Sequence, residues 1–302
     1  MTENIHKFKT TPDDQGQRID KWIKNNLSKI PQSLIEKDLR KGKIKVNKHK
    51  VKSSYKLKKN DKIYLYNFSY RNLKTTKKKY IPKVKEIKET EKDIIENNSD
   101  FIVINKKAGL PVQGGTKIKE NVINILSNSN LFEKSKPYVV HRIDKDTSGI
   151  LIVAKNRETA QLLTSLFRIR KIHKTYIAIA HGSISKKIKK MEDSLISYEN
   201  QKKIIQKAIS HINIIKKSTD YTLVELNPIT GRKHQLRKQL YNIGNPIVGD
   251  SKYFINNLYF RKINDKNLML HAYKIKFMIN NIKYNFKAKY SKNFEDFLKN
   301  NF

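Results

Sequence analysis

A series of short apolar segments from residue 100 onward constrains the fold of this chain more than any other feature. The segments that fit β-strands are FIVINKK at 101–107, VVHRI at 139–143, GILIVAKN at 149–156, KTYIAIAHG at 174–182, KAISHINII at 207–215 and YTLVELNP at 221–228. LHAYKIKFMI at 270–279 and IKYNFKAKY at 282–290 flank Asn280-Asn281, which favours a hairpin turn. Helices are indicated near 157–170 and 233–243. Because strands with few intervening helices favour a mixed or antiparallel sheet, we expect an α+β domain rather than a doubly wound one.

The N-terminal part of the chain has a different pattern, which is typical of a small ααβ module. A first helix is indicated by apolar residues at roughly helical spacing, namely Ile19, Trp22, Ile23 and Leu27. Pro31 and Ser33 open a second helix, and Gly42 ends it. Alternating apolar and polar residues over 43–66 then predict strands.

These patterns divide the chain into four parts. We expect an N-terminal tail at 1–15, the small module at 16–68, a linker at 69–97 and the larger α+β domain at 98–302. The linker prediction rests on the abundance of Lys and Glu, on Pro82 and on the lack of apolar periodicity.

The charge of the chain predicts a polyanionic partner. Its 65 Lys and Arg residues against 27 Asp and Glu give a net charge of +38. Such a surface attracts nucleic acid through salt-dependent contacts with phosphates. A general bias of the sequence towards lysine is an alternative explanation for the same charge.

The composition also excludes several kinds of site. The chain has no cysteine, which rules out disulfides, Cys-ligated zinc and thiol nucleophiles. It has neither a GxGxxG nor a GxxxxGK[ST] motif, so a nucleotide-cofactor loop is not expected. The N-terminus lacks the apolar core of a signal peptide, and no apolar stretch reaches the ~18 residues of a membrane span. We therefore expect a soluble, cytoplasmic protein without a membrane partner.

One charged loop, HRIDKDTSG at 141–149, lies between two apolar segments, and such loops commonly hold functional residues. Asp144 in this loop could be a nucleophile, a metal ligand or a turn residue that accepts backbone N–H bonds, and the bare loop favours the turn residue. Asp146 and His141 have the same structural alternative. Metal binding is disfavoured because no HxxxH, HxH or carboxylate cluster accompanies the loop.

Several motifs together resemble the RluA-type pseudouridine synthases. HRIDKDTSG closely resembles the HRLDxxTSG signature of that family. The other matching segments are NKKAGLPVQGG at 105–115, HKTYIAIAHG at 173–182, GRKHQLRKQL at 231–240, NPIVGDSKY at 245–253 and LMLHAYKIKF at 268–277. In front of them, the small module is similar to the S4 RNA-binding domain in Arg18-Ile-Asp, LRKGKIKVN and Asp61-Lys-Ile. The resemblance implies an α+β pseudouridine synthase domain preceded by an S4 domain.

This resemblance implies roles for three residues in the isomerisation of a uridine. Asp144 corresponds to the catalytic aspartate, Tyr176 to the aromatic residue that contacts the target uracil, and Arg237 to the cation paired with the aspartate. The reaction breaks a C–N glycosidic bond and forms a C–C bond at the same ribose, so it needs a carboxylate but no metal or redox cofactor. The sequence leaves open whether Asp144 attacks the base, attacks C1′ or removes a ribose proton.

The resemblance also implies where RNA binds. Arg142 beside the catalytic loop would hold phosphates, and His141 and Lys174 lie in the same motifs. In the S4-like module, the second helix and the turn after it would place five cations near phosphates, namely Lys37, Arg40, Lys41, Lys43 and Lys45. Without the resemblance, a solvated charged face is the simpler explanation for these cations. The implied partner is large-subunit (23S) ribosomal RNA, bound by a monomer.

The chain departs from the family pattern at a few positions. Lys107 stands where the first motif usually has proline, and we expect this to loosen that loop. His234 and Gln235 are expected to orient their turn rather than to take part in the chemistry. Because Asp144 and Arg237 are both present, we expect an active enzyme. The alternative is an inactive RNA-binding or ribosome-assembly factor with the same fold.

Overall fold

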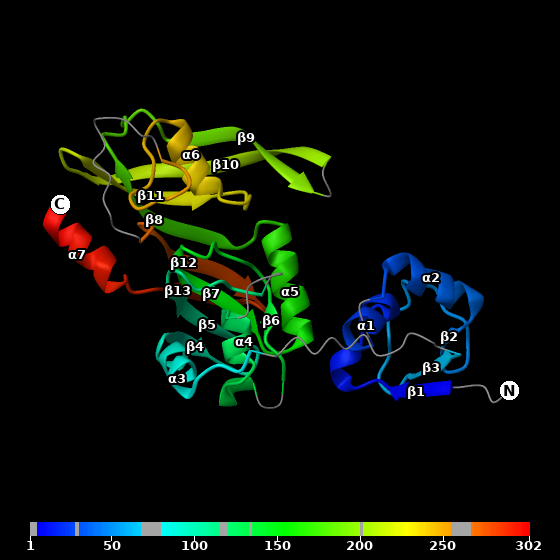
Figure 1. The fold of residues 1–302 in the computed structure, drawn as a ribbon. Coiled ribbons are helices and arrows are strands. Elements are labelled where there is room, and N and C mark those ends of the chain that lie inside the picture. The colour runs from blue at the N-terminus through cyan, green and yellow to red at the C-terminus, as the bar shows by residue number, and fades with distance from the viewer. Residues whose placement is uncertain are drawn as a thin grey trace. The chain divides into compact units, whose positions relative to one another are not determined.

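The computed structural model describes residues 5–27, 30–67, 80–114, 120–132, 135–199, 202–254 and 267–302. The chain divides into two compact units, Met1–Lys79 and Tyr80–Phe302 (Figure 1). The first part of the expected linker, residues 69–79, lies outside the described residues. None of the helices that the structure describes is long and apolar enough to cross a membrane.

The smaller unit combines two α-helices with a three-stranded antiparallel sheet. Its elements are β1 (Ile5–Lys9), η1 (Pro12–Asp14), α1 (Ile19–Asn26), α2 (Gln32–Lys41), β2 (Ile44–Val46) and β3 (Lys62–Tyr66), with strand order β1-β3-β2. Apolar side chains from both helices, β2 and β3 form one core that includes Ile19, Leu39 and Ile63. Both predicted helices are confirmed, and α2 ends where predicted because Gly42 adopts a φ of +73°.

The segment expected as an N-terminal tail contains a strand. β1 pairs antiparallel with β3, with Ile5 opposite Tyr66 and Lys9 opposite Lys62. The Phe8 ring packs edge-on against Trp22 at a centroid distance of 5.7 Å. All five residues of β1 are exposed, so its short sequence lacks the buried alternation that indicates a strand. The prediction of a tail over 1–15 was therefore wrong for residues 5–9.

The larger unit is built on a ten-stranded mixed sheet. Its strands are β4 (Ile94–Asn97), β5 (Phe101–Lys106), β6 (Tyr138–Val139), β7 (Ser148–Ala154), β8 (His173–His181), β9 (Lys190–Glu199), β10 (Lys202–Lys217), β11 (Tyr221–Pro228), β12 (Leu270–Ile279) and β13 (Ile282–Lys287). They lie in the order β4-β5-β7-β12-β8-β11-β10-β9, with β6 paired to β7 and β13 to β12. β7 and β12 run parallel, and the other described pairs in this sheet are antiparallel. The α+β class is confirmed.

Helices flank this sheet (Figure 1). They are α3 (Val84–Lys92), α4 (Val122–Leu126), η2 (Asn130–Phe132), α5 (Arg157–Arg168), α6 (Gln235–Asn242) and α7 (Lys292–Asn301). α5 lies against β6 and β7, and α6 lies against β9. Both helices predicted for this part of the chain are confirmed as α5 and α6.

The described part of the expected linker is ordered secondary structure. α3 and β4 occupy most of 84–97, and β4 extends the sheet beside β5. Only Thr90 is buried in α3, and no residue of β4 is fully buried. α3 consists mostly of charged residues and β4 has only four residues, so neither has a clear apolar pattern in the sequence. The linker prediction was therefore wrong over this stretch.

The strand predicted at 139–143 is much shorter than expected. β6 ends at Val139, and the chain continues as a loop to the start of β7 at Ser148. The Nε2 atom of His141 accepts the backbone N–H of Ile152 at 2.9 Å, so a side chain takes the place of a strand neighbour here. The loop that the sequence singled out is thereby longer than its apolar flanks suggested.

The parallel pairing of β7 with β12 fixes the start of β7, directly after the charged loop. His271 lies opposite Ser148, and Ala272 lies opposite Gly149. Gly149 has a φ of +106°, and a Cβ at this position would lie 2.3 Å from the carbonyl oxygen of Ala272. Ala272 is also the register partner of Tyr176 on β8. β12 therefore brings the charged loop and the predicted substrate tyrosine to neighbouring strands.

Candidate active site

A cavity of about 680 Å³ in the larger unit brings the predicted site residues of that unit together. Its walls come from the loop before β7, the start of β8, the C-terminal end of α5 and the turn that leads into α6. The residues predicted from sequence that line it are His141, Arg142, Asp144, Lys174, Tyr176 and Arg237. Asp144 is the one carboxylate among the described residues of this lining, and its side chain is 27% exposed.

Arg237 faces Asp144, but Asp250 binds it more closely. The Nε and NH2 atoms of Arg237 each donate to a carboxylate oxygen of Asp250 at 2.7 Å. Its remaining terminal nitrogen, NH1, lies 3.9 Å from Oδ2 of Asp144. Burial alone would lower the pKa of Arg237, but Asp250 and Asp144 together raise it. The sequence found the cation and missed Asp250, although the carboxylate lies in the quoted segment NPIVGDSKY.

Asp250 is held by the turn that contains it. Its Oδ1 atom accepts the backbone N–H groups of Lys252 and Tyr253 at 2.9 and 3.0 Å. Gly249, directly before it, has a φ of +74°, and a Cβ there would lie 2.0 Å from the carbonyl oxygen of Asn267. The close backbone approach at Gly249 thus sets the position of Asp250, and through it that of Arg237.

His234 lies on the other side of the Asp144 carboxylate. Its Nε2 atom is 3.9 Å from Oδ1 of Asp144, and its Nδ1 atom is 3.0 Å from the Tyr253 hydroxyl. The residue caps α6 with a left-handed backbone, at φ +52° and ψ +32°. We expected His234 only to orient its turn, and the structure places its ring beside the carboxylate.

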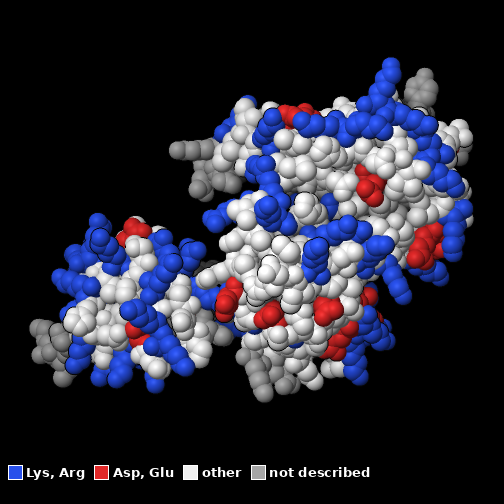
Figure 2. All heavy atoms as spheres, turned by 180° about the vertical axis from the view of Figure 1, so that it is seen from behind, with Lys and Arg blue, Asp and Glu red and all other residues white. Residues whose placement is uncertain are grey.

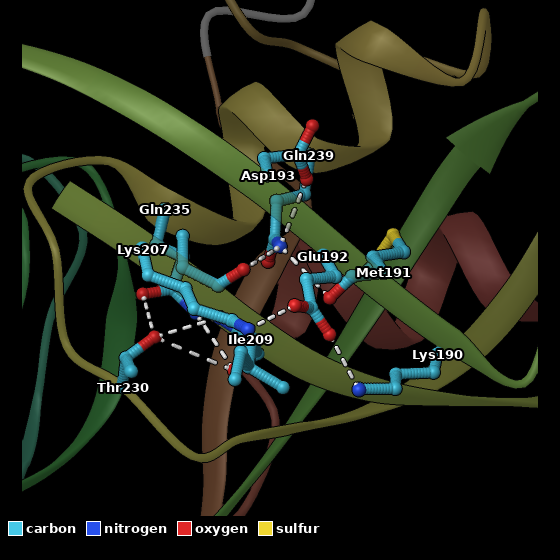
Figure 3. A network of polar contacts seen from close by, with 10 residues as sticks. Lys190, Met191, Glu192, Asp193, Lys207, Ile209, Thr230, Gln235 and Gln239 are labelled. Carbon is cyan, nitrogen blue, oxygen red and sulfur yellow. Dashed lines mark hydrogen bonds and ion pairs between the residues drawn. The ribbon is translucent and has the colours of Figure 1, made fainter. Parts of the chain in front are cut away.

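Gln235, in contrast, holds the turn as expected. Its Oε1 atom accepts from the Thr230 hydroxyl at 2.7 Å and from the Arg232 amide at 3.0 Å. Its Nε2 atom donates to Ser210 Oγ at 2.9 Å and to the Ile209 carbonyl at 3.1 Å. Figure 3 shows this network beside Gln239, which binds Asp193 on β9. Hydrogen bonds of Gln235 therefore hold the start of α6 against β10, and the hydrogen bond of Gln239 holds the helix against β9.

Tyr176 projects from β8 as a half-buried residue lining the cavity. Burial and the nearby charge of Asp144 raise the pKa of its hydroxyl. The phenol consequently stays protonated at neutral pH, where its ring and its O–H donor are available to a substrate.

His141 has partners within the protein. Besides accepting the Ile152 amide, its ring stacks on Phe167 at a centroid distance of 4.5 Å. Burial lowers the pKa of His141 to about 3, so the ring is neutral at physiological pH. These contacts give His141 a role in shaping the loop around Arg142 and Asp144.

The cavity is strongly cationic. Burial lowers the pKa of the Lys174 ammonium. Six cations line the cavity, namely Arg142, Arg168, Arg170, Lys174, Arg232 and Arg237. The sequence did not identify Arg168 and Arg170, which follow one another closely at the C-terminal end of α5. Their signal in the sequence was a pair of arginines in the last turn of the helix predicted over 157–170.

A buried lysine, Lys106, forms hydrogen bonds that support the loop containing Asp144. The Nζ atom of Lys106 donates to the carbonyls of Lys107, Leu110 and Lys145 at 2.8, 2.9 and 2.9 Å. Lys145 lies between the two aspartates of the loop, and its carbonyl also accepts the Gly109 amide at 3.0 Å. The first motif is therefore firmly tied to the catalytic loop.

We had expected Lys107 to loosen its loop, but its side chain lies close to two acidic residues. Its ammonium lies 3.6 Å from Glu89 on α3 and 3.5 Å from Asp93. The residue that replaces the usual proline thus connects this loop to α3.

The cations predicted in the smaller unit lie on its surface. Lys37, Arg40 and Lys41 are exposed on α2, Lys43 is exposed after it, and Lys45 on β2 lies 4.9 Å above the Tyr66 ring. None of these five makes an ion pair with another described residue. Figure 2 shows Lys and Arg spread over the visible faces of both units.

Among the described residues, no group of three His, Cys, Asp or Glu side chains is arranged to hold a metal ion.

Comparison with known proteins matches both units. The family model described as RNA pseudouridylate synthase covers residues 100–242, and the S4 domain model covers residues 17–63. A protein of Buchnera aphidicola subsp. Baizongia pistaciae (strain Bp), named ribosomal large subunit pseudouridine synthase C, is 34% identical over 91% of this chain and 90% of its own length. A protein of Haemophilus ducreyi (strain 35000HP / ATCC 700724) with the same name is 32% identical over 92% of this chain and 89% of its own length.

Solved structures agree with this assignment. Human RNA pseudouridylate synthase domain containing 4 aligns with a TM-score of 0.60 at 25% identity, over 71% of this chain and 94% of that one. The human domain-containing 1 protein has the same fold, with a TM-score of 0.55 at 22% identity over 66% of this chain and 83% of its own. The chain therefore belongs to the RNA pseudouridylate synthase family and is a pseudouridine synthase with an S4 domain before its catalytic unit.

Proposed function

We propose that this enzyme isomerises specific uridines in large-subunit (23S) ribosomal RNA, with Asp144 as the catalytic carboxylate. The observation that carries the proposal is the placement of Asp144 as the one described carboxylate in a cavity lined by six cations. The relatives named above, which are called ribosomal large subunit pseudouridine synthases, support the choice of RNA.

The geometry of the cavity supports complementary roles for three of its residues. The C1′–N1 bond of the uridine must break, the base must turn, and a C1′–C5 bond must form before C5 loses its proton. Asp144 is the group that meets C1′ or the base, while Arg237 stabilises its negative charge across 3.9 Å. Tyr176 stacks on the uracil and donates a hydrogen bond, because its raised pKa keeps the hydroxyl protonated.

The cationic lining fits a nucleotide that has left its helix. Extruding a base from structured RNA costs a few kcal/mol, which contacts with the flanking phosphates must offset. Arg142 in the loop that contains Asp144 and Lys174 on β8 line the cavity, which supports such contacts, and Arg168 and Arg170 add two more cations. The cavity therefore offers several partners for phosphates around a single carboxylate.

The smaller unit would hold RNA outside the reacting nucleotide. The five exposed or half-buried cations on α2, the turn after it and β2 support contacts with phosphates, and Lys45 over Tyr66 adds an aromatic face. We propose that residues 5–67 form this RNA-binding domain and residues 80–302 the catalytic domain. We further propose that the enzyme acts as a monomer in the cytoplasm.

Mapping pseudouridines in ribosomal RNA tests the proposal. Cells that lack the gene should lose pseudouridine at specific 23S positions, and wild-type protein should restore them. Asp144→Asn, which keeps the size of the side chain but removes its charge, should not restore them. Unchanged maps in all strains would refute the choice of substrate. Restoration by Asp144→Asn would refute the role of Asp144.

A further inference from the structure

His234 lies beside the Asp144 carboxylate and Tyr253 binds His234, an arrangement that the sequence motifs did not predict. Oδ1 of Asp144 faces Nε2 of His234, and Oδ2 faces NH1 of Arg237, each at 3.9 Å. The two nitrogens come from the cap and the first turn of one helix, α6. Each carboxylate oxygen therefore has its own nitrogen neighbour on the same element.

The negative charge of Asp144 and the contact with Tyr253 together favour one position for the proton of the neutral imidazole. An unprotonated Nε2 would direct a lone pair at the negative Asp144, so the favoured neutral form has its proton on Nε2. Nδ1 is then an acceptor, and the Tyr253 hydroxyl donates to it at 3.0 Å. A hydroxyl can donate or accept, but here only donation leaves Nε2–H directed towards the carboxylate.

The surrounding charges favour this neutral form. Burial lowers the pKa of His234, and Arg237, Lys252 and Lys233 lower it further, whereas Asp144 opposes them. Among the described residues, Tyr253 also faces the ring, through its hydroxyl. The neutral imidazole therefore presents an Nε2–H group, rather than a second positive charge, to the carboxylate 3.9 Å away.

Tyr253 also holds the other neighbour of Asp144. Its ring lies 5.2 Å from the guanidinium carbon of Arg237, and its amide donates to Asp250, which binds Arg237 through two hydrogen bonds. One tyrosine thus fixes the nitrogens on both sides of the carboxylate.

The backbone of His234 is a further sign of function. Residues with a side chain rarely adopt its left-handed conformation, and such conformations concentrate at functional sites. A glycine would fit this cap without strain, yet a histidine occupies it with its ring beside Asp144.

We propose that His234, held as its Nε2–H form by the Tyr253 hydroxyl, is a positioning residue that orients the carboxylate of Asp144. The expected effect on kcat rests on the proposed function, whereas the expected proton on Nε2 of His234 does not. Nε2 and the carboxylate oxygen are 3.9 Å apart, and a hydrogen bond between them forms when the bound substrate brings them closer together.

Kinetics on a ribosomal RNA transcript test this role. His234→Gly removes the ring and relieves the backbone, so we expect stable protein whose kcat falls about 10- to 100-fold with KM within about twofold of wild type. His234→Gln, which keeps an N–H donor, should recover part of the lost kcat. Tyr253→Phe should lower kcat less than His234→Gly does. Tyr241→Phe is the matched control, because this neighbouring ring on α6 is 6.3 Å from Tyr253 and does not contact His234.

A spectroscopic measurement separates this inference from the choice of substrate. In full-length protein with ¹⁵N-labelled histidine, and without RNA, His234 should show a protonated Nε2 and a bare Nδ1. Tyr253→Phe and Asp144→Asn should each shift it towards a mixture of both forms. A protonated Nδ1 in the wild-type protein would overturn the inference, as would wild-type kcat in His234→Gly or a raised KM with unchanged kcat. Wild-type protein that forms no pseudouridine would refute the proposed function instead, and the imidazole spectrum would still decide this inference.

Discussion

Thr147 follows the two aspartates of the catalytic loop and is only 2% exposed. Its hydroxyl has no hydrogen-bond partner among the described groups of the protein, and an unpaired buried hydroxyl costs ~1–3 kcal/mol. We expect Thr147→Val, which keeps the shape and removes the hydroxyl, to raise the free energy of unfolding by ~1 kcal/mol in urea titrations. Ser148→Ala is the opposite case, because Ser148 Oγ binds Nδ1 of His271 at 2.9 Å, and it should lower stability. Equal changes in the free energy of unfolding for the two variants would contradict the conclusion that the Thr147 hydroxyl is unpaired.

His141 predicts how stability depends on pH. The folded protein keeps this ring neutral, with a pKa of about 3, whereas in the unfolded chain the pKa is ~6.5. Unfolding therefore takes up a proton between these values, and stability falls as pH is lowered through this window. For this residue the slope approaches ~1.4 kcal/mol per pH unit near pH 5. His141→Gln should lose that part of the slope between pH 6 and 5, and an unchanged slope would show that the ring is not held neutral.

At the scale of residues, sequence motifs identified the members of the site better than their partners. Asp144, Tyr176 and Arg237 lie in one cavity, as predicted. The tight pairing of Arg237 with Asp250 was missed, because it depends on how α6 and a later turn pack. Nothing in the spacing of a single sequence reports that a carboxylate will be buried against a particular guanidinium.

The start of β7 is the element on which the catalytic loop depends. Gly149→Ala would place a methyl group 2.3 Å from the Ala272 carbonyl in a backbone conformation that disfavours side chains. We expect it to destabilise the catalytic unit by at least ~3 kcal/mol, from steric overlap and strain together. Gly244→Ala is the matched control, because Gly244 also has a positive φ, +81°, but a Cβ there has nothing within 4 Å. Thermal unfolding should show a much smaller loss for the control, ~1 kcal/mol, and similar losses would mean that the contact with Ala272 is unimportant.

Among the elements, those with a clear apolar pattern were predicted, as was β13 from its hairpin turn, whereas β1, β4 and α3 were not. β5, β7 and β8 contain runs of buried apolar residues, β11 alternates buried and half-buried positions, and α5 and α6 each have buried positions along one face. β1 and β4 pair along one side of a sheet without fully buried residues, and α3 is mostly charged. Such elements owe their structure to tertiary contacts, which local sequence patterns do not encode.

At the scale of the whole molecule, the charge of the smaller unit predicts a salt-dependent contribution to RNA binding. Neutralising Arg40, Lys41 and Lys43 together should reduce the slope of log K against log salt by up to ~2–3, since each phosphate contact contributes ~0.7–0.9. The matched control neutralises Lys56, Lys58 and Lys59, which are equally exposed in the same unit. Filter binding at several salt concentrations distinguishes the two sets. Equal slopes for both variants would leave general attraction, rather than a defined contact surface, as the source of affinity.

The parallel pairing of β7 with β12 also has a consequence for how the enzyme is made. Ser148 and His271, which meet in this pair, are 123 positions apart in sequence. A ribosome adding ~5–20 residues per second needs several seconds to travel between them. The loop that contains Asp144 therefore reaches its final conformation late in synthesis, after β12 has been made. This pseudouridine synthase thus acquires its active site only after most of its own translation is complete.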